Sequence, residues 1–247
     1  QGALGALIGL ADRLDTLVGI FAVAKGPTGS ADPFGLRRAA SGILTILSAF
    51  DFRLNVMEAV REAMRTVGDR AKKPAEQVAS EVEAFLRTRL KSAITAEGVP
   101  TDVAEAVLAA DAEDPVRCRA RARALAEVQK AADFAAVAST FKRVGNILKQ
   151  AGEPVGPPDP AQFRDPAEQA LHQRNGEVRQ AVRSAIDGGD YRAAFRRLAD
   201  LQSAVDGFFD GVMVMAEDPQ LRDNRVKLVA ETQRIFAPLA DLTRLSS

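Results

Sequence analysis

The sequence predicts an all-α fold, a helical bundle of about ten helices. Apolar residues recur three and four positions apart in segment after segment, which places them on one face of each helix. No segment alternates apolar and polar residues with β-branched enrichment, which is the pattern of a half-buried strand. With 247 residues, 47% of them apolar, the chain is long enough to bury a large core.

The first part of the chain should form five of these helices. The apolar spacing puts them at about 2–24, 33–50, 53–67, 74–97 and 100–110. Asp32 before Pro33 is typical of an N-cap followed by proline at the first helical position. Gly68 and Gly98 favour helix ends, because glycine readily adopts the left-handed backbone that terminates a helix.

The second part should form the remaining helices, in two blocks. They should begin at about residues 115, 134, 167, 191 and 219. Residues 152–166 contain five prolines and two glycines, which cannot form regular structure, so we expect an exposed loop that joins the two blocks. Asp190 and Asp218 are expected to cap the helices that follow them.

The composition restricts the partners and the compartment. Lys plus Arg and Asp plus Glu both total 33, so no net positive charge drives nonspecific nucleic-acid binding, and any RNA contact must be local. Cys118 is the only cysteine, which excludes a disulfide within the chain and favours the cytoplasm. Residues 2–10 are apolar but too short to span a bilayer. Because Gln1 lies within a predicted helix, we expect a fragment of a longer protein.

No complete catalytic or metal-binding motif is present. Phosphate-binding glycine loops, metalloprotease motifs and nucleophile elbows are absent from the sequence. His172 is the only histidine, and we expect it to be a solvent-exposed residue on a polar helix surface. Asp12 and Asp15 lie three apart on one helical face and could be half of a metal site. Surface carboxylates paired with Arg13 or Lys25 are the favoured interpretation.

One helix carries a polar row beside its apolar face. Lys142, Asn146 and Lys149 follow the helical spacing i, i+4 and i+7, with Arg143 further round. Two ammonium groups and an amide in a row suit phosphates and base edges. The alternative is that the row is only the solvated side of an amphipathic helix. Arg196, with neighbouring arginines, could extend a basic surface.

A second set of charges is expected to be structural. The apolar spacing predicts that one helix continues through residues 205–216, with Asp206 and Asp210 on its flank. A turn at 217–219 would fold the last helix back against it, which places Arg225 opposite Asp210. We therefore predict a partly buried pair between Asp206 or Asp210 and Arg225.

Several stretches together resemble one family, the β subunit of the bacterial heterotetrameric glycyl-tRNA synthetase. The resemblance lies in ADRLDTL at 11–17, PTG at 27–29, DPFGLRRA at 32–39, FKRVGNIL at 141–148, residues 205–215 and DNR at 223–225. The order and spacing of these motifs cover nearly the whole chain.

The resemblance implies a domain layout. Residues 1–28 would be the last helix of an HD-like domain, 29–112 a helical connector, and 113–247 a DALR-type anticodon-binding domain. In this family glycine activation is assigned to the α subunit, so the chain would be part of an aminoacyl-tRNA synthetase without a catalytic site of its own. No cofactor is expected in it, with ATP and Mg used by the α subunit.

The implied partners are tRNA(Gly), the α subunit and a second β subunit in an α2β2 assembly, with no DNA and no membrane. Lys142, Arg143 and Asn146 match the motif helix of DALR-type domains, which adds to the RNA-binding interpretation of that row. Two other functions stay open. One is a helical scaffold that docks subunits without RNA contact. The other is a phosphohydrolase remnant that depends on Asp12 and Asp15 alone.

Overall fold

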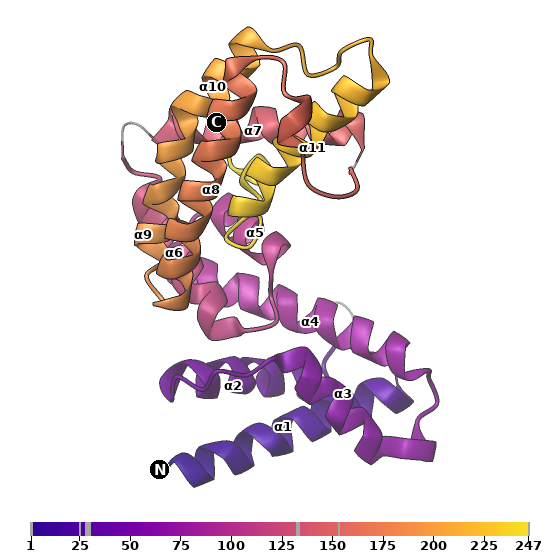
Figure 1. The fold of residues 1–247 in the computed structure, drawn as a ribbon. Coiled ribbons are helices and arrows are strands. Elements are labelled where there is room, and N and C mark those ends of the chain that lie inside the picture. Colours follow the sequence, from indigo (N-terminus) through magenta and orange to yellow (C-terminus); the bar gives the residue numbers. More distant parts are fainter. Residues whose placement is uncertain (1, 25, 28–30, 132–133, 153, 247) are drawn as a thin grey trace. The chain divides into compact units, whose positions relative to one another are not determined.

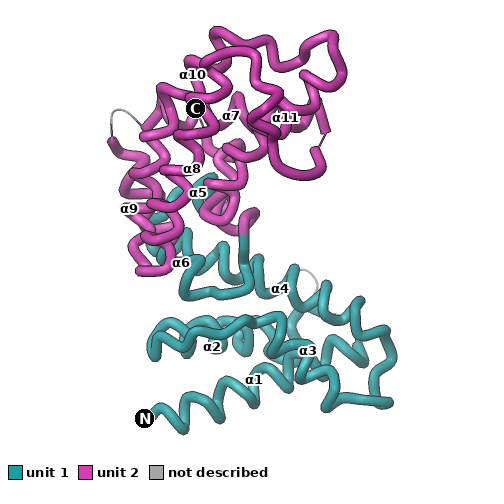
Figure 2. The backbone as a smooth tube through the Cα atoms, in the orientation of Figure 1, with its two compact units in different colours: residues 1–104, 111–120 teal, residues 105–110, 121–247 magenta. Residues whose placement is uncertain are grey.

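The computed structural model describes residues 2–24, 26–27, 31–131, 134–152 and 154–246 (Figure 1). This part of the chain is helical from α1 to α11 and has no β-strand, so the predicted all-α class is confirmed. The chain forms two compact units, residues 1–104 with 111–120 and residues 105–110 with 121–247 (Figure 2). The predicted boundary after residue 28 lies outside the described residues, and the one after residue 112 stays a prediction.

The first unit is built around one apolar core. Its helices are α1 (Ala3–Val23), α2 (Leu36–Ala49), α3 (Val56–Val67), followed by the short η1 (Gly68–Arg70), and α4 (Ala75–Ala96). α1 packs against each of the other three α-helices. Leu17, Ile43, Val60 and Val82, one from each helix, have no exposed surface. Each of the four helices therefore contributes apolar side chains to a shared core, although Leu4, Leu7 and Ile8 at the start of α1 are exposed.

The start of α2 differs from the prediction. Pro33 is not the first helical residue, because Gly35 adopts a left-handed backbone with φ of 66° and the helix begins only at Leu36. Asp32 nevertheless caps the helix, since its carboxylate accepts the backbone N–H of Leu36 at 2.8 Å and that of Arg37 at 3.0 Å. The prediction placed the capping residue correctly and missed the turn between it and the helix.

The second unit contains the larger set of helices. They are α7 (Phe134–Ala151), α8 (Pro166–Asp187), α9 (Tyr191–Arg197), α10 (Gln202–Gly211) and α11 (Pro219–Phe236), with the short η2 (Pro160–Gln162), η3 (Leu198–Leu201) and η4 (Leu242–Arg244). The division between units falls within α5 (Thr101–Ala110) and α6 (Pro115–Val128). α10 and α11 both pack against α7 and α8. Phe141 and Phe236 join α7 to α11, with ring centroids 4.6 Å apart.

Local start signals and the proline-rich loop behave as predicted in this unit. Asp190 and Asp218 cap α9 and α11 through their side chains, and Asp165 forms a capping box with Glu168 at the start of α8. The loop before α8 is mostly exposed. It is held to α11 where the Asn224 side chain accepts the Asp159 backbone N–H at 2.7 Å and donates to its carbonyl at 3.0 Å.

The helix predicted through residue 216 ends earlier. α10 stops at Gly211, and Val212 already has extended backbone angles. The following buried residues alternate with exposed ones, since Val212, Val214 and Ala216 are buried whereas Met213 and Met215 are exposed. Positions 205, 208, 209, 212 and 216 fit a helical stripe, but from 212 onward the same residues also fit the period of an extended segment. The β-branched residues there favour the extended form.

Candidate nucleic-acid interface

The predicted polar row lies on α7 beside the face that enters the core. Phe141, Val144 and Leu148 are buried, and this fixes the rotation of the helix. Arg143, Asn146 and Lys149 are exposed as a result, and Lys142 is half-buried. Lys142 also lines a hollow of about 420 Å³ with Phe134 and Leu245. As the spacing predicted, Asn146 exposes its amide and Lys149 its ammonium group to solvent.

Arg143 is held against α10. Its guanidinium carbon lies 4.5 Å from the centroid of the Phe209 ring, and Nη2 donates to the Phe209 carbonyl at 3.4 Å. Nη1 lies 3.8 Å from Oδ1 of Asp210. One turn earlier on α7, the Thr140 hydroxyl donates to Oδ1 of Asp206 at 2.9 Å. These contacts fix how α7 and α10 lie side by side.

The predicted pair between Arg225 and Asp206 or Asp210 is wrong. Both aspartates face α7, and Nε of Arg225 donates to Oε1 of Glu168 on α8 at 2.8 Å. Nη1 of Arg225 donates to the Met213 carbonyl at 2.9 Å. The prediction assumed a tight hairpin between two abutting helices, but an extended segment separates α10 from α11. A glutamate in a capping box was the signal that could have identified the partner.

Glu168 is a buried anion with several donors. Its Oε2 accepts the backbone N–H groups of Arg164 at 2.5 Å and Asp165 at 2.8 Å, in addition to the Arg225 bond at Oε1. Burial disfavours the charged carboxylate, but the hydrogen bonds from Arg225 and the two amides outweigh burial and hold the pKa of Glu168 below its ordinary value of 4.5. The carboxylate therefore has a structural role.

His172 is not the solvent-exposed residue that the sequence predicted. It is half-buried, and Nδ1 lies 2.9 Å from Oε2 of Glu231 on α11. Arg179 donates to Oε1 of the same carboxylate at 2.6 Å, and Asn175 donates to Oε2 at 3.2 Å. Burial opposes the charge, but bonds from Arg179, His172 and Asn175 leave the pKa of Glu231 below its ordinary value. The sequence around His172 predicted only a polar helix face, and it did not indicate that several of these side chains would bind one carboxylate.

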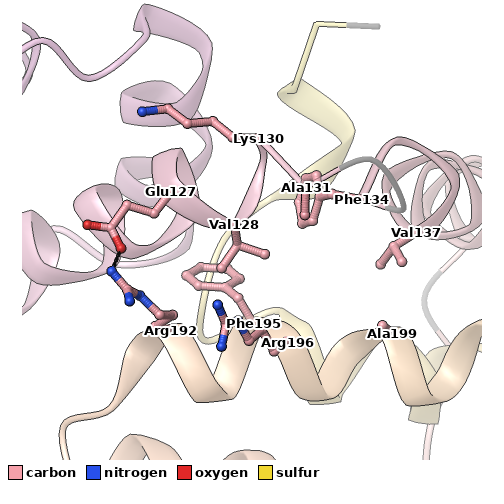
Figure 3. Close-up of a pocket in the computed structure, with 10 residues that line it drawn as sticks. All are labelled: Glu127, Val128, Lys130, Ala131, Phe134, Val137, Arg192, Phe195, Arg196 and Ala199. Atoms are coloured by element: carbon pink, nitrogen blue, oxygen red, sulfur yellow. Dashed lines mark ion pairs between the residues drawn. The ribbon is translucent and has the colours of Figure 1, made fainter.

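Arg196 lies in a different hollow from Lys142 (Figure 3). This pocket has a volume of about 560 Å³, and its rim carries the cations of Lys130, Arg192 and Arg196. Arg192 is paired with Glu127. Four buried apolar side chains also line it, namely Val128, Phe134, Val137 and Phe195. Phe134 borders both hollows, so the two basic regions are neighbours rather than one continuous row.

The candidate carboxylates of the first unit lie at its surface. Asp12 and Asp15 are exposed on α1, and Arg13 donates to the Gly9 carbonyl at 2.7 Å. Across the described residues no group of three or more His, Cys, Asp or Glu side chains is arranged to hold a metal ion. None of the described helices combines the length and apolar character needed to cross a membrane.

Two family models match the chain. The model for the glycyl-tRNA synthetase beta subunit matches residues 1–109, and the model for the DALR anticodon binding domain matches residues 137–245. The second match contains most of α7 and the Arg143 contacts with α10.

Whole proteins named glycine–tRNA ligase beta subunit are also similar to it. One from Anaeromyxobacter dehalogenans (strain 2CP-C) is 45% identical over 246 residues, covering 99% of this chain and 35% of that protein. One from Myxococcus xanthus (strain DK1622) is 42% identical, covering 98% of this chain and 35% of that protein. The chain thus spans about a third of the length of these relatives. The resemblance is thus confirmed along nearly the whole sequence: residues 1–109 match the family of the glycyl-tRNA synthetase β subunit, and residues 137–245 match the DALR anticodon binding domain.

Proposed function

We propose that residues 137–245 bind tRNA(Gly) in its anticodon region, so that the chain is the tRNA-binding part of a glycine–tRNA ligase β subunit. The observation that carries this proposal is that the exposed polar side of α7 lies within the DALR match. Lys142 and Lys149 supply cations for phosphates, and Asn146 supplies an amide for base edges. Such local contacts suit a chain with no net charge.

The rest of the enzyme enters the proposal through the names of the relatives. A β subunit implies a separate α subunit, and we assign glycine activation, with its ATP and magnesium, to that subunit. A second β subunit in an α2β2 assembly and a cytoplasmic location complete the proposal. Neither DNA nor a membrane is a proposed partner.

Binding of tRNA(Gly) to the purified chain tests the proposal directly. We expect tRNA(Gly) to bind more tightly than a tRNA for another amino acid, with protection from ribonuclease confined to the anticodon stem and loop. Affinity should fall steeply between about 50 and 200 mM salt, because each phosphate contact releases counterions. Equal binding of both tRNAs, or protection elsewhere on tRNA(Gly), would contradict the anticodon assignment.

A subunit scaffold is the second candidate, and exposed apolar residues on α1 favour it for the first unit. Leu4, Leu7 and Ile8 are 73%, 48% and 63% exposed, which is unusual for side chains of this size. Association through such a surface responds weakly to salt, unlike binding to phosphates. Replacing Leu4 and Ile8 with serine should weaken binding of the α subunit and leave tRNA binding unchanged if this surface docks a subunit.

A further inference from the structure

We infer that Arg143 is a stacking platform for an unpaired nucleobase that carries an exocyclic amino group. The inference rests on the proposed tRNA binding and identifies a base-binding position within it. Proteins that bind unpaired bases stack them on aromatic rings or on the flat guanidinium group of arginine.

Few of the aromatic rings described in the second unit are accessible for stacking. Among its described residues, every phenylalanine and the one tyrosine are buried except Phe163, which is half-buried and meets the His172 ring edge-on. Exposed guanidinium planes are therefore the better candidates for stacking on this unit.

Arg143 meets the requirements for such a plane. Its guanidinium lies over the Phe209 ring at 4.5 Å, so one face is already covered by a buried aromatic side chain. The Phe209 carbonyl and Asp210 hold the group from its edge. Half of the Arg143 side chain is still exposed. The result is a cationic surface whose orientation is set before a ligand arrives, which lowers the entropy cost of binding.

The neighbours of this surface suit a base rather than a phosphate. Asp210 is 78% exposed, and its Oδ1 lies 3.8 Å from Nη1 of Arg143. A carboxylate repels phosphate but accepts a hydrogen bond from the exocyclic amino group of cytosine, adenine or guanine, whereas uracil offers only its ring N3–H as a donor. Asn146, one helical turn along α7, exposes an amide beside it. The site thus combines stacking with an acceptor that favours bases with an exocyclic amino group.

Replacing Arg143 with lysine separates stacking from charge. Lysine keeps the positive charge and loses the planar group, so the Arg143→Lys chain should bind tRNA(Gly) roughly tenfold more weakly. Its salt dependence should match that of the wild-type chain, because the number of neutralised phosphates is unchanged. Arg183→Lys is the matched control, since Arg183 is an exposed arginine on α8, and its affinity should not change.

A fluorescent single-stranded RNA containing 2-aminopurine reports stacking separately from affinity. The wild-type chain should quench this probe, and Arg143→Lys should not, even at concentrations that saturate binding. Phe209→Leu, which keeps the site apolar but removes the ring beneath Arg143, should reduce quenching as well. Oligocytidylate should also bind the wild-type chain more tightly than oligouridylate, and Asp210→Asn should reduce that preference.

The outcomes distinguish this inference from the function on which it rests. If Arg143→Lys binds tRNA(Gly) and quenches the probe like the wild-type chain, Arg143 is not a platform although tRNA binding stands. If both oligonucleotides bind equally, the recognition of an amino group by Asp210 is wrong. If the wild-type chain binds no tRNA, the proposed function itself fails, and the platform with it.

Discussion

Arg225 and Glu168 form a buried ion pair that joins α11 to the start of α8. Nε of Arg225 donates to Oε1 at 2.8 Å, the Arg225 side chain is 11% exposed, and the Glu168 side chain has no exposed surface. The other oxygen of Glu168 accepts two backbone amides at the same helix start. One carboxylate therefore completes a helix cap and an interhelical contact together.

Removing the arginine should destabilise the protein strongly. Arg225→Ala leaves the Glu168 carboxylate buried without its cation, which should lower the free energy of unfolding by about 3 kcal/mol. Asp210→Ala is the control, and it should cost less than about 1 kcal/mol because Asp210 is mostly exposed. Urea denaturation of both variants measures the difference. A larger loss for Asp210→Ala would support the pairing expected from the sequence instead of the pair with Glu168.

The sequence predicted what depends on nearby residues and missed what depends on the path of the chain. Asp190 and Asp218 cap helices through contacts within three residues, so the sequence alone was enough to identify them. The apolar face of α7 likewise decided which polar side chains would be exposed. Arg225 was paired wrongly because its partner depends on where an extended segment carries the chain. The contact of Arg143 with Phe209 joins residues 66 apart, and the sequence contains no local sign of it.

Acid should unfold the protein through Glu168 and Glu231. Both carboxyls have a folded-state pKa below 4.5, so the unfolded chain takes up protons first as the pH falls. The stability they contribute is complete above about pH 5 and declines below 4.5, until both groups are also protonated in the folded protein. Urea denaturation at pH 7, 5, 4 and 3.5 should show this decline.

Glu231→Gln provides the control for that pH dependence. The glutamine keeps much of the shape but does not ionise, so the variant should be less stable at pH 7 and should lose less stability between pH 5 and 3.5. His172 and Arg179 both contact this carboxylate, and both are retained in the variant. An identical decline in the variant and the wild-type chain would exclude Glu231 as a source of the acid sensitivity.

Reversing two charges on α7 should weaken tRNA binding. Lys142→Glu combined with Lys149→Glu replaces two cations by anions, so affinity for tRNA(Gly) should fall at least tenfold near 100 mM salt, roughly the effect of losing two phosphate contacts. The helical circular dichroism signal should not change. Arg61→Glu with Arg87→Glu makes the same charge change on exposed positions of the first unit and should have a smaller effect. Unchanged affinity of the α7 variant at low salt would remove this helix from the interface.

Gly145 should be required because α7 contacts η4 at that position. A Cβ atom at Gly145 would lie 2.5 Å from Cγ2 of Thr243, which is closer than atoms can approach. Thr243 cannot easily turn aside, since its hydroxyl donates to Oδ1 of Asp241 at 2.6 Å. Gly145→Ala should therefore lower the free energy of unfolding by about 1–3 kcal/mol. This loss is expected even though alanine stabilises a helix by about 1 kcal/mol relative to glycine.

Thr243→Ser tests whether that methyl group is the cause. Serine keeps the hydroxyl bonded to Asp241 and lacks Cγ2, so the single variant should cost little. The double variant Gly145→Ala with Thr243→Ser should recover most of the stability lost by Gly145→Ala, because the overlapping atom is gone and the helix preference of alanine is left. Urea denaturation of the wild-type chain and the three variants gives the coupling between the two positions. Additive effects would mean that Gly145 is needed for some reason other than its contact with Thr243.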